Sequence, residues 1–434
     1  MTHRVPPLRP GRTATRGDAA AGPGALLQLI LEGGDWTRAR LVEESGLARS
    51  TVADRLTALL DSGLVIAAPG TSTGGRPAEV FRFNEQGGHL LVADVGSSHT
   101  RVGITDLGGR PLAVRDADLD VAAGPDAVLG YLVATFAELL VDTGVEASKV
   151  RGAGLGLPSP VELSGRLVRP PMGSTPTGSG SAWDSTLVAE AVTAGLVRTG
   201  LPQFLVVVDK DANILTLGEH RTTWAQYDDV IVLKVGMSIG CGLVVGGRIA
   251  RGARGVAGDI GHIPDGTGPL CRCGQRGCAE ATASGTAIAA ALAADGVSVR
   301  TSRDVVRLVH EGHPRAIALL DQAGHRLGAL VADAVSTLNP SLVVVGGNLA
   351  EDNEPLLTAI REVVLARAHP YVTRHLQIVR SRIAADAGLI GAAHLVRDRV
   401  LAAEAVDAAI GVTPTRDDPT LGPGGLLSFD KQKV

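Results

Sequence analysis

The sequence predicts an α/β body of two lobes, preceded by a small α+β module and flanked by a tail at each end. Over most of the chain, short runs of β-branched residues alternate with helical stretches, and each run ends in Gly or Asp. This alternation is typical of an α/β sheet with ligands at its strand ends. Three short amphipathic stretches precede the body, and 434 residues are too many for a single core.

Composition changes divide the chain into four segments. We expect residues 1–22 and 404–434, which are rich in Pro and Gly, to be disordered tails. The sequence N-E-Q-G-G-H at 84–89 separates a module of residues 23–86 from a body of residues 87–403.

The body is expected to contain two lobes, each opening with a strand and an Asp/Gly turn. Its expected strands are 90–95, 205–208, 230–235 and 342–345, and its clearest helices are 187–198 and 321–338.

Charge and hydropathy exclude several classes of protein. No run reaches the ~18 apolar residues of a membrane span, and the first twenty residues lack the apolar core of a signal peptide. We therefore expect a cytoplasmic protein without membrane contact. Its net charge is −4, and residues 1–86 hold ten Arg against nine Asp and Glu. Any DNA binding must come from individually placed arginines.

The N-terminal module is predicted to hold three helices. Thr37 can cap the second helix, and Gly46 supplies the turn to the third. In the third helix, Val52, Leu56 and Leu59 recur at helical spacing and should face inward.

The opposite face of this third helix is suited to DNA. Small polar residues there would reach base edges and arginines would reach phosphates, as in a recognition helix. The expected DNA-binding residues on this helix are Arg49, Ser50, Thr51, Asp54 and Arg55. A plain three-helix bundle used for protein contacts is the alternative.

A two-stranded wing is predicted after Gly63. The runs L-V-I-A and V-F-R-F can pair, and the connection between them contains G-G-R-P. Arg76 in this tip could enter a narrow minor groove. The helix and wing together resemble the winged helix-turn-helix of bacterial repressors. Because one short recognition helix reads only a half-site, we expect a homodimer or homotetramer on a palindromic double-stranded operator.

The most specific motif is G-D-I-G-H-I-P-D-G-T-G-P-L-C-R-C-G-Q-R-G-C-A-E, residues 258–280. His262, Cys271, Cys273 and Cys278 supply one imidazole and three thiolates, a closed tetrahedral set for one structural Zn²⁺ per chain. Cys241 stands apart and is expected to be a small core residue.

With this loop, residues 26–400 resemble the ROK family (repressors, open reading frames and sugar kinases). The resemblance implies an actin-like, ribonuclease H-like, two-lobed ATPase fold with a sugar pocket beside the zinc loop. It implies that His262 serves both zinc and sugar, and that Glu280 contacts a sugar hydroxyl. It also places Asp211, in D-K-D-A-N, at the general-base position. The alternative role for Asp211 is a helix N-cap.

The nucleotide turns implied by the resemblance are altered. Residues 94–100 read D-V-G-S-S-H-T where the kinases have D-x-G-G-T, and 236–242 read G-M-S-I-G-C-G against G-T-G-x-G. A third turn, V-V-V-G-G-N at 343–348, is nearer the family pattern. Side chains at the first two turns would stand where phosphates approach the backbone. We therefore expect neither ATP binding nor kinase activity.

The sugar pocket is altered as well. Lys210 replaces a family Asn and Asp259 replaces a Glu, while only Trp183 remains of the segment N-L-P-G-W. Lys210 could recruit an anionic ligand such as a sugar phosphate, or pair with Asp211 or Asp259 and fill the pocket. The expected ligand-binding residues are Lys210, Asp211, Asp259, His262 and Glu280.

The sequence thus predicts a transcription repressor that responds to a sugar or a sugar phosphate. One alternative is an ATP-dependent sugar kinase that carries a DNA-binding module, supported by Asp211 and the complete zinc loop. Another is a DNA-binding architectural protein with a collapsed pocket.

Overall fold

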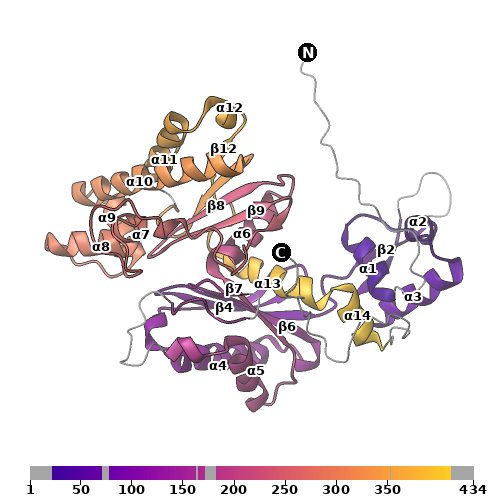
Figure 1. The fold of residues 1–434 in the computed structure, drawn as a ribbon. Helices are drawn as coiled ribbons and strands as arrows, with labels where there is room; N and C mark the ends of the chain where they lie inside the picture. Colours follow the sequence, from indigo (N-terminus) through magenta and orange to yellow (C-terminus); the bar gives the residue numbers. More distant parts are fainter. Residues whose placement is uncertain (1–21, 71–77, 163–164, 172–181, 352, 412–434) are drawn as a thin grey trace, which may run out of the picture. The chain divides into compact units, whose positions relative to one another are not determined.

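The computed structural model describes residues 22–70, 78–162, 165–171, 182–351 and 353–411. The chain divides into two compact units (Figure 1). One unit combines the chain up to Asn84 with the chain from Leu401 onward, and the other is Glu85–Val400. Among the helices of these ranges, none is long and apolar enough to cross a membrane.

The first unit contains a three-helix motif and a hairpin. Its elements are α1 (Pro23–Leu31), α2 (Arg38–Ser45), α3 (Arg49–Asp61), β1 (Val65–Pro69) and β2 (Glu79–Phe83). The two strands pair antiparallel, as expected for the wing.

The helix boundaries follow the predicted signals. The Thr37 hydroxyl accepts a hydrogen bond from the Arg40 amide at 3.2 Å and caps α2. Gly46 ends α2 with φ +68°, the left-handed conformation that favours glycine. The core of this unit consists of apolar side chains with less than 3% exposure: Leu26, Leu27, Ile30, Trp36, Leu41, Val52, Leu56, Leu59, Val65, Phe81 and Val406.

A C-terminal helix completes the first unit. Residues Ala403–Ile410 form α14, which packs against α1. The Gly24 amide donates to Asp407 Oδ1 at 2.7 Å, and Gln28 Nε2 donates to the Leu401 carbonyl at 2.7 Å. The prediction of a disordered tail from residue 404 is therefore wrong over this helix, whose position depends on contacts between the two ends of the chain. Residues 412–434 and 1–21 lie outside the described ranges.

The second unit holds two five-stranded sheets of the same topology. The first has the order β5-β4-β3-β6-β7 and the second β10-β9-β8-β11-β12. The strands of the first sheet are β3 (His89–Val95), β4 (Thr100–Asp106), β5 (Pro111–Ala117), β6 (Val150–Leu157) and β7 (Leu205–Lys210). Those of the second are β8 (Val230–Val235), β9 (Ile239–Val245), β10 (Arg248–Ile249), β11 (Leu342–Gly346) and β12 (Gln377–Arg380).

Each sheet is built around its first strand. Strand β3 pairs antiparallel with β4 and parallel with β6, and β8 pairs antiparallel with β9 and parallel with β11. The expected two lobes, each opening with a strand and a tight turn, are thus confirmed. The repeat makes Asp94 of β3 and Lys234 of β8 equivalent, since each is the penultimate residue of its strand.

Helices flank the sheets (Figure 1). The α-helices are α4 (Pro125–Thr143), α5 (Val188–Arg198), α6 (Asp211–Thr223), α7 (Ala279–Ala283), α8 (Gly285–Ala294), α9 (Ser302–His310), α10 (Pro314–Leu338), α11 (Glu354–Arg367), α12 (Pro370–Thr373) and α13 (Ala387–Val400). Short 3₁₀ turns lie at Val121–Ala123, Ala147–Lys149, Ala182–Ser185, Ile260–His262 and Ala384–Asp386.

Two of these helices join the lobes. Helix α6 contacts strands of both sheets, and α13 packs against α6 and the first sheet. Their backbones approach so closely that a Cβ on Gly391 would lie 1.7 Å from the Ile214 carbonyl. This contact positions the N-terminus of α6, and therefore Asp211, between the lobes.

Candidate functional site

Four residues of the predicted metal loop meet at one point. The ligand atoms of His262, Cys271, Cys273 and Cys278 all lie within 4.8 Å of one another. Cys271 Sγ is 3.5 Å from His262 Nδ1, and Cys273 Sγ is 3.5 Å from Cys278 Sγ. Three thiols and one imidazole at this spacing can hold a metal ion, and the donor set is that of structural zinc sites.

Glycine and one arginine shape this loop. At Gly277, φ is +75° and a Cβ would lie 1.7 Å from Asp265 Oδ1, so only glycine fits between the ligands. Arg326 of α10 donates to the Gly277 carbonyl at 2.8 Å and pairs with Asp265 at 3.1 Å. Arg326 thus joins the loop to the helical layer of the second lobe.

The predicted ligand residues lie together beside this cluster. Lys210, Asp211, Asp259, His262 and Glu280 all line one small cavity of about 20 Å³. A water molecule needs roughly 10–15 Å³ on this scale, whereas small-molecule sites have volumes of roughly 300–1,000 Å³. The structure brings the predicted residues together but leaves room for no more than a water molecule.

Ion pairs fill this cavity. Lys210 Nζ lies 3.8 Å from Asp259 Oδ1, and Arg169 Nη2 lies 3.2 Å from Asp259 Oδ2. Of the two pairings expected for Lys210, the structure shows the one with Asp259. Arg169 was not among the predicted residues, because its partner is 90 residues away in the chain.

Glu280 faces the same cavity from α7. Its Oε2 accepts a hydrogen bond from the Ile239 amide at 2.7 Å. Burial raises the pKa of this carboxyl to about 7. Near neutral pH, Glu280 can therefore act as either donor or acceptor toward a polar group in the cavity.

Asp211 is the first residue of α6, and Lys210 occupies the N-cap position. Asp211 Oδ1 accepts from the Ala212 amide at 2.7 Å, and Oδ2 contacts Lys234 Nζ at 2.6 Å. The alternative role of Asp211 as N-cap is therefore wrong by one position, since the N-cap of α6 is Lys210. Lys234 was not predicted as a site residue. Burial acts to lower the pKa of its ammonium group, but the charges of Asp211 and Asp94 outweigh that effect and raise the pKa.

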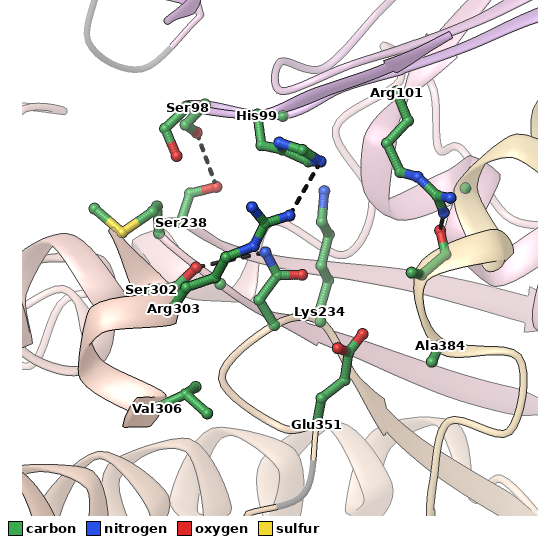
Figure 2. Close-up of a pocket in the computed structure, with 18 of the residues that line it drawn as sticks. Ser98, His99, Arg101, Lys234, Ser238, Ser302, Arg303, Val306, Glu351 and Ala384 are labelled. Carbon is green, nitrogen blue, oxygen red and sulfur yellow. Dashed lines mark hydrogen bonds between the residues drawn. The ribbon is translucent and has the colours of Figure 1, made fainter. Parts of the chain in front are cut away.

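A larger cavity of about 620 Å³ lies between the lobes, lined by residues of the turns at 94–100, 236–242 and 343–348 and of α9 (Figure 2). Ser97 and Ser238, from the first and second turns, are 3.3 Å apart at their hydroxyl oxygens. Asn348 of the third turn donates to Ser302 at 3.5 Å. One side-chain contact therefore joins the first and second turns and another joins the third turn to α9, where a nucleotide-binding site would need open backbone amides.

The charged side chains around this larger cavity pair with one another. Arg101 contacts Asp116 at 2.8 Å, and Arg307 contacts Glu311 at 2.9 Å. Arg303 lies 3.5 Å from His99 (Figure 2). The cavity is therefore polar, and these three arginines each contact another side chain of the protein.

The predicted recognition helix is α3. Arg49, Ser50 and Asp54 are exposed, and Thr51 and Arg55 are half-buried. Its inward side chains, Val52 and Leu56, are at most 1% exposed. The polar face expected for base contacts is thus open to solvent. Arg76 lies outside the described residues.

Comparisons with known proteins agree with this architecture. The model of the ROK family matches residues 91–399. The xylose repressor of Bacillus subtilis is 25% identical over 379 residues, covering 87% of this chain and 94% of the repressor. A glucokinase of Thermotoga maritima is 29% identical over 328 residues, covering 72% of this chain and 98% of the kinase.

Solved structures include both kinds of relative. A ROK family transcriptional regulator, described as a homologue of the E. coli MLC protein, superposes with a TM-score of 0.72 at 24% identity, covering 89% of this chain and 98% of the regulator. A ROK glucokinase from Streptomyces griseus, with glucose and AMPPNP bound, gives a TM-score of 0.56 at 27% identity, covering 71% of this chain and 99% of the kinase. The family model matches well over half of the chain, and this chain belongs to the ROK family.

Proposed function

We propose that this chain is a DNA-binding transcription repressor whose kinase-like body has lost phosphoryl-transfer activity. The observation that carries the proposal is the exposed polar face of α3 beside the paired strands β1 and β2. A helix with small polar residues and arginines outward, held by an apolar inner face, is the element that reads a major groove. The match to the xylose repressor over 87% of the chain supports this proposal.

The DNA contact would be made as follows. Ser50, Thr51 and Asp54 would face base edges, and Arg49 and Arg55 would contact phosphates. Arg76 would reach the adjacent minor groove. Two or four copies would bind a palindromic double-stranded operator, since each α3 spans one half-site. A protein with this partner would act in the cytoplasm.

The metal loop would hold one structural Zn²⁺ per chain. His262, Cys271, Cys273 and Cys278 complete a tetrahedral shell and leave no position for a catalytic water. Zinc would stiffen residues 258–280, which carry Asp259, His262 and Glu280 toward the small cavity. The ion would therefore affect ligand binding indirectly, by holding this loop and its three cavity residues in place.

The effector would be a sugar or a sugar phosphate, with the phosphate favoured by charge. In the closed cavity, Asp259 is the anion that Lys210 and Arg169 share. A sugar phosphate could take its place on these two cations, with Asp211, His262 and Glu280 toward the hydroxyls. Binding would separate Lys210 from Asp259 and open the cavity, coupling the ligand to the arrangement of the lobes.

A gel-shift assay with the DNA upstream of the protein's own coding sequence tests the proposal. At moderate salt we expect one specific complex that resists competitor DNA. Arg49→Ala should weaken binding and lower the salt dependence by about one ion. Arg198→Ala, an exposed arginine of α5, is the matched control and should have no effect. Equal affinity for competitor and upstream DNA would overturn the proposal.

A sugar kinase carrying a DNA-binding module is the second candidate. It is favoured by the retained Asp211, the cavity of about 620 Å³ and the match to glucokinases. An ADP-release assay across hexoses, amino sugars and their phosphates decides between the two. Turnover that Asp211→Asn abolishes would establish the kinase, and we expect none.

A further inference from the structure

We propose that Lys234 serves as a built-in cation between Asp94 and Asp211, two carboxylates that without it would form a divalent-metal site between the lobes. Its ammonium group would thereby exclude the metal ion from the kinase-like cleft and join the two lobes by charge. The inference rests on the proposed loss of kinase activity, and it is independent of DNA recognition.

The three residues come from different parts of the fold. Lys234 is the penultimate residue of β8 in the second sheet, and Asp94 is the penultimate residue of β3 in the first. Asp211 opens α6, the helix that contacts both sheets. The sequences D-V-G-S-S and K-V-G-M-S show the two equivalent positions, one acidic and one basic. The internal repeat therefore places a negative charge at this position in the first lobe and a positive charge at the equivalent position in the second.

The central contact is short and buried. Lys234 Nζ lies 2.6 Å from Asp211 Oδ2, and these side chains are 16% and 6% exposed. Lys234 extends from its strand into the cleft (Figure 2). The ammonium group and the Ala212 amide together engage both oxygens of Asp211. The ion pair with Lys234 stabilises the ionised form of Asp211 and therefore weakens it as a base toward a sugar hydroxyl.

Asp94 supplies the second carboxylate. Its Oδ1 is buried and has no hydrogen-bond partner among the described residues. Burial raises the pKa of Asp94, the positive charge of Lys234 lowers it, and Asp211 raises it again. Asp94 and Lys234 both line the larger cavity, and Asp211 is near enough for its charge to act on Asp94. Without Lys234, these two carboxylates would have no cation between them. Such pairs hold a proton or bind a hard cation such as Mg²⁺ or Mn²⁺.

The choice of lysine fits this role. The chain has five lysines among its 41 Lys and Arg residues, so arginine is its usual cation. A compact ammonium with three donors fits between two carboxylates, whereas a planar guanidinium needs more room. Phosphoryl transfer needs a divalent ion and a free carboxylate base, and the ammonium occupies the place of both.

Mn²⁺ binding to the zinc-loaded full-length chain tests the inference, with free Mn²⁺ followed by electron paramagnetic resonance. Lys234→Met should gain one Mn²⁺ site with a dissociation constant of roughly 10⁻⁴ M. The wild type should bind about tenfold more weakly or not at all. Adding Asp94→Asn to the Lys234→Met variant should abolish the new site. Lys149→Met, which removes an exposed lysine, is the matched control and should resemble the wild type.

Two results would overturn the inference. One is a wild type that binds one Mn²⁺ as tightly as Lys234→Met, and the other is a folded Lys234→Met that gains no site. If circular dichroism shows Lys234→Met to be unfolded, the double variant Lys234→Met/Asp211→Asn decides, since removing one carboxylate with the lysine should restore folding. A double variant that stays unfolded would contradict the proposed pairing. Because Mn²⁺ binding is read without DNA, failure of the gel-shift would leave this result intact.

Discussion

Replacing Asp407 by Ala should loosen α1, because the carboxylate of Asp407 caps that helix from a distant part of the chain. Helix α1 begins after Gly22, which has no side chain to accept from the first amides. Asp407 Oδ1 instead accepts from the Gly24 amide at 2.7 Å, across 383 positions of sequence. The substitution leaves an amide at the helix start without its acceptor.

The size of the effect follows from two contributions. Losing an N-cap acceptor costs about 1 kcal/mol, and losing a negative charge near a helix N-terminus costs about 0.3–1 kcal/mol. Together they destabilise α1 by about 1.5 kcal/mol, which corresponds to roughly tenfold faster local opening. Asp407→Asn keeps an acceptor and should lose only the charge contribution.

Hydrogen exchange of the peptide covering Pro23–Leu31 measures this effect directly. Exchange should become about tenfold faster in Asp407→Ala and two- to fivefold faster in Asp407→Asn. Glu404→Ala, an exposed position on the same helix, is the control and should leave exchange unchanged. Unchanged exchange in Asp407→Ala, or an equal change in Glu404→Ala, would refute the capping role of α14.

Three further changes test the body. Cys271→Ser should lower the zinc content to well below one ion per chain, measured by elemental analysis. It should also speed proteolysis within residues 258–280, measured by limited digestion. Burial lowers the pKa of His394 to about 3. Below pH 6.5, His394 therefore binds a proton in the unfolded chain but stays neutral in the folded chain. Stability should therefore fall from pH 6.5 to pH 5 by about 2 kcal/mol more than in His394→Gln, measured by urea unfolding. Asp259→Ala leaves Lys210 and Arg169 without their shared anion and should cost about 3 kcal/mol in the same assay; an unchanged midpoint would show that these pairs do not close the cavity.

Local signals were enough to predict much of the fold. Strand β8 spans the predicted 230–235, and the Thr37 cap and the Gly46 turn lie where their residue types required them. The three cysteines of the metal cluster fall within eight positions, and His262 precedes them by nine. Each of these features depends on neighbours in sequence, so the pattern itself carries the geometry.

Features that depend on distant contacts were not predictable in this way. Helix α14 is short, and its contact with α1 joins the two ends of the chain, so its composition alone suggested a tail. The pairing of Lys234 with Asp211 follows from the repeat that brings β8 beside α6. The sequence pointed to Lys210 as the unusual cation near Asp211. In the fold, Lys210 pairs with Asp259, and Lys234 pairs with Asp211.

Footprinting of the upstream DNA tests the central claim, sequence-specific operator recognition by α3, most directly. The account predicts two protected half-sites whose centres lie about 10 base pairs apart, or a multiple of that spacing. Protection should be lost in Ser50→Arg, which places a bulky cation at an exposed position of the recognition face. Uniform protection along the fragment, or a pattern that Ser50→Arg leaves unchanged, would contradict the claim.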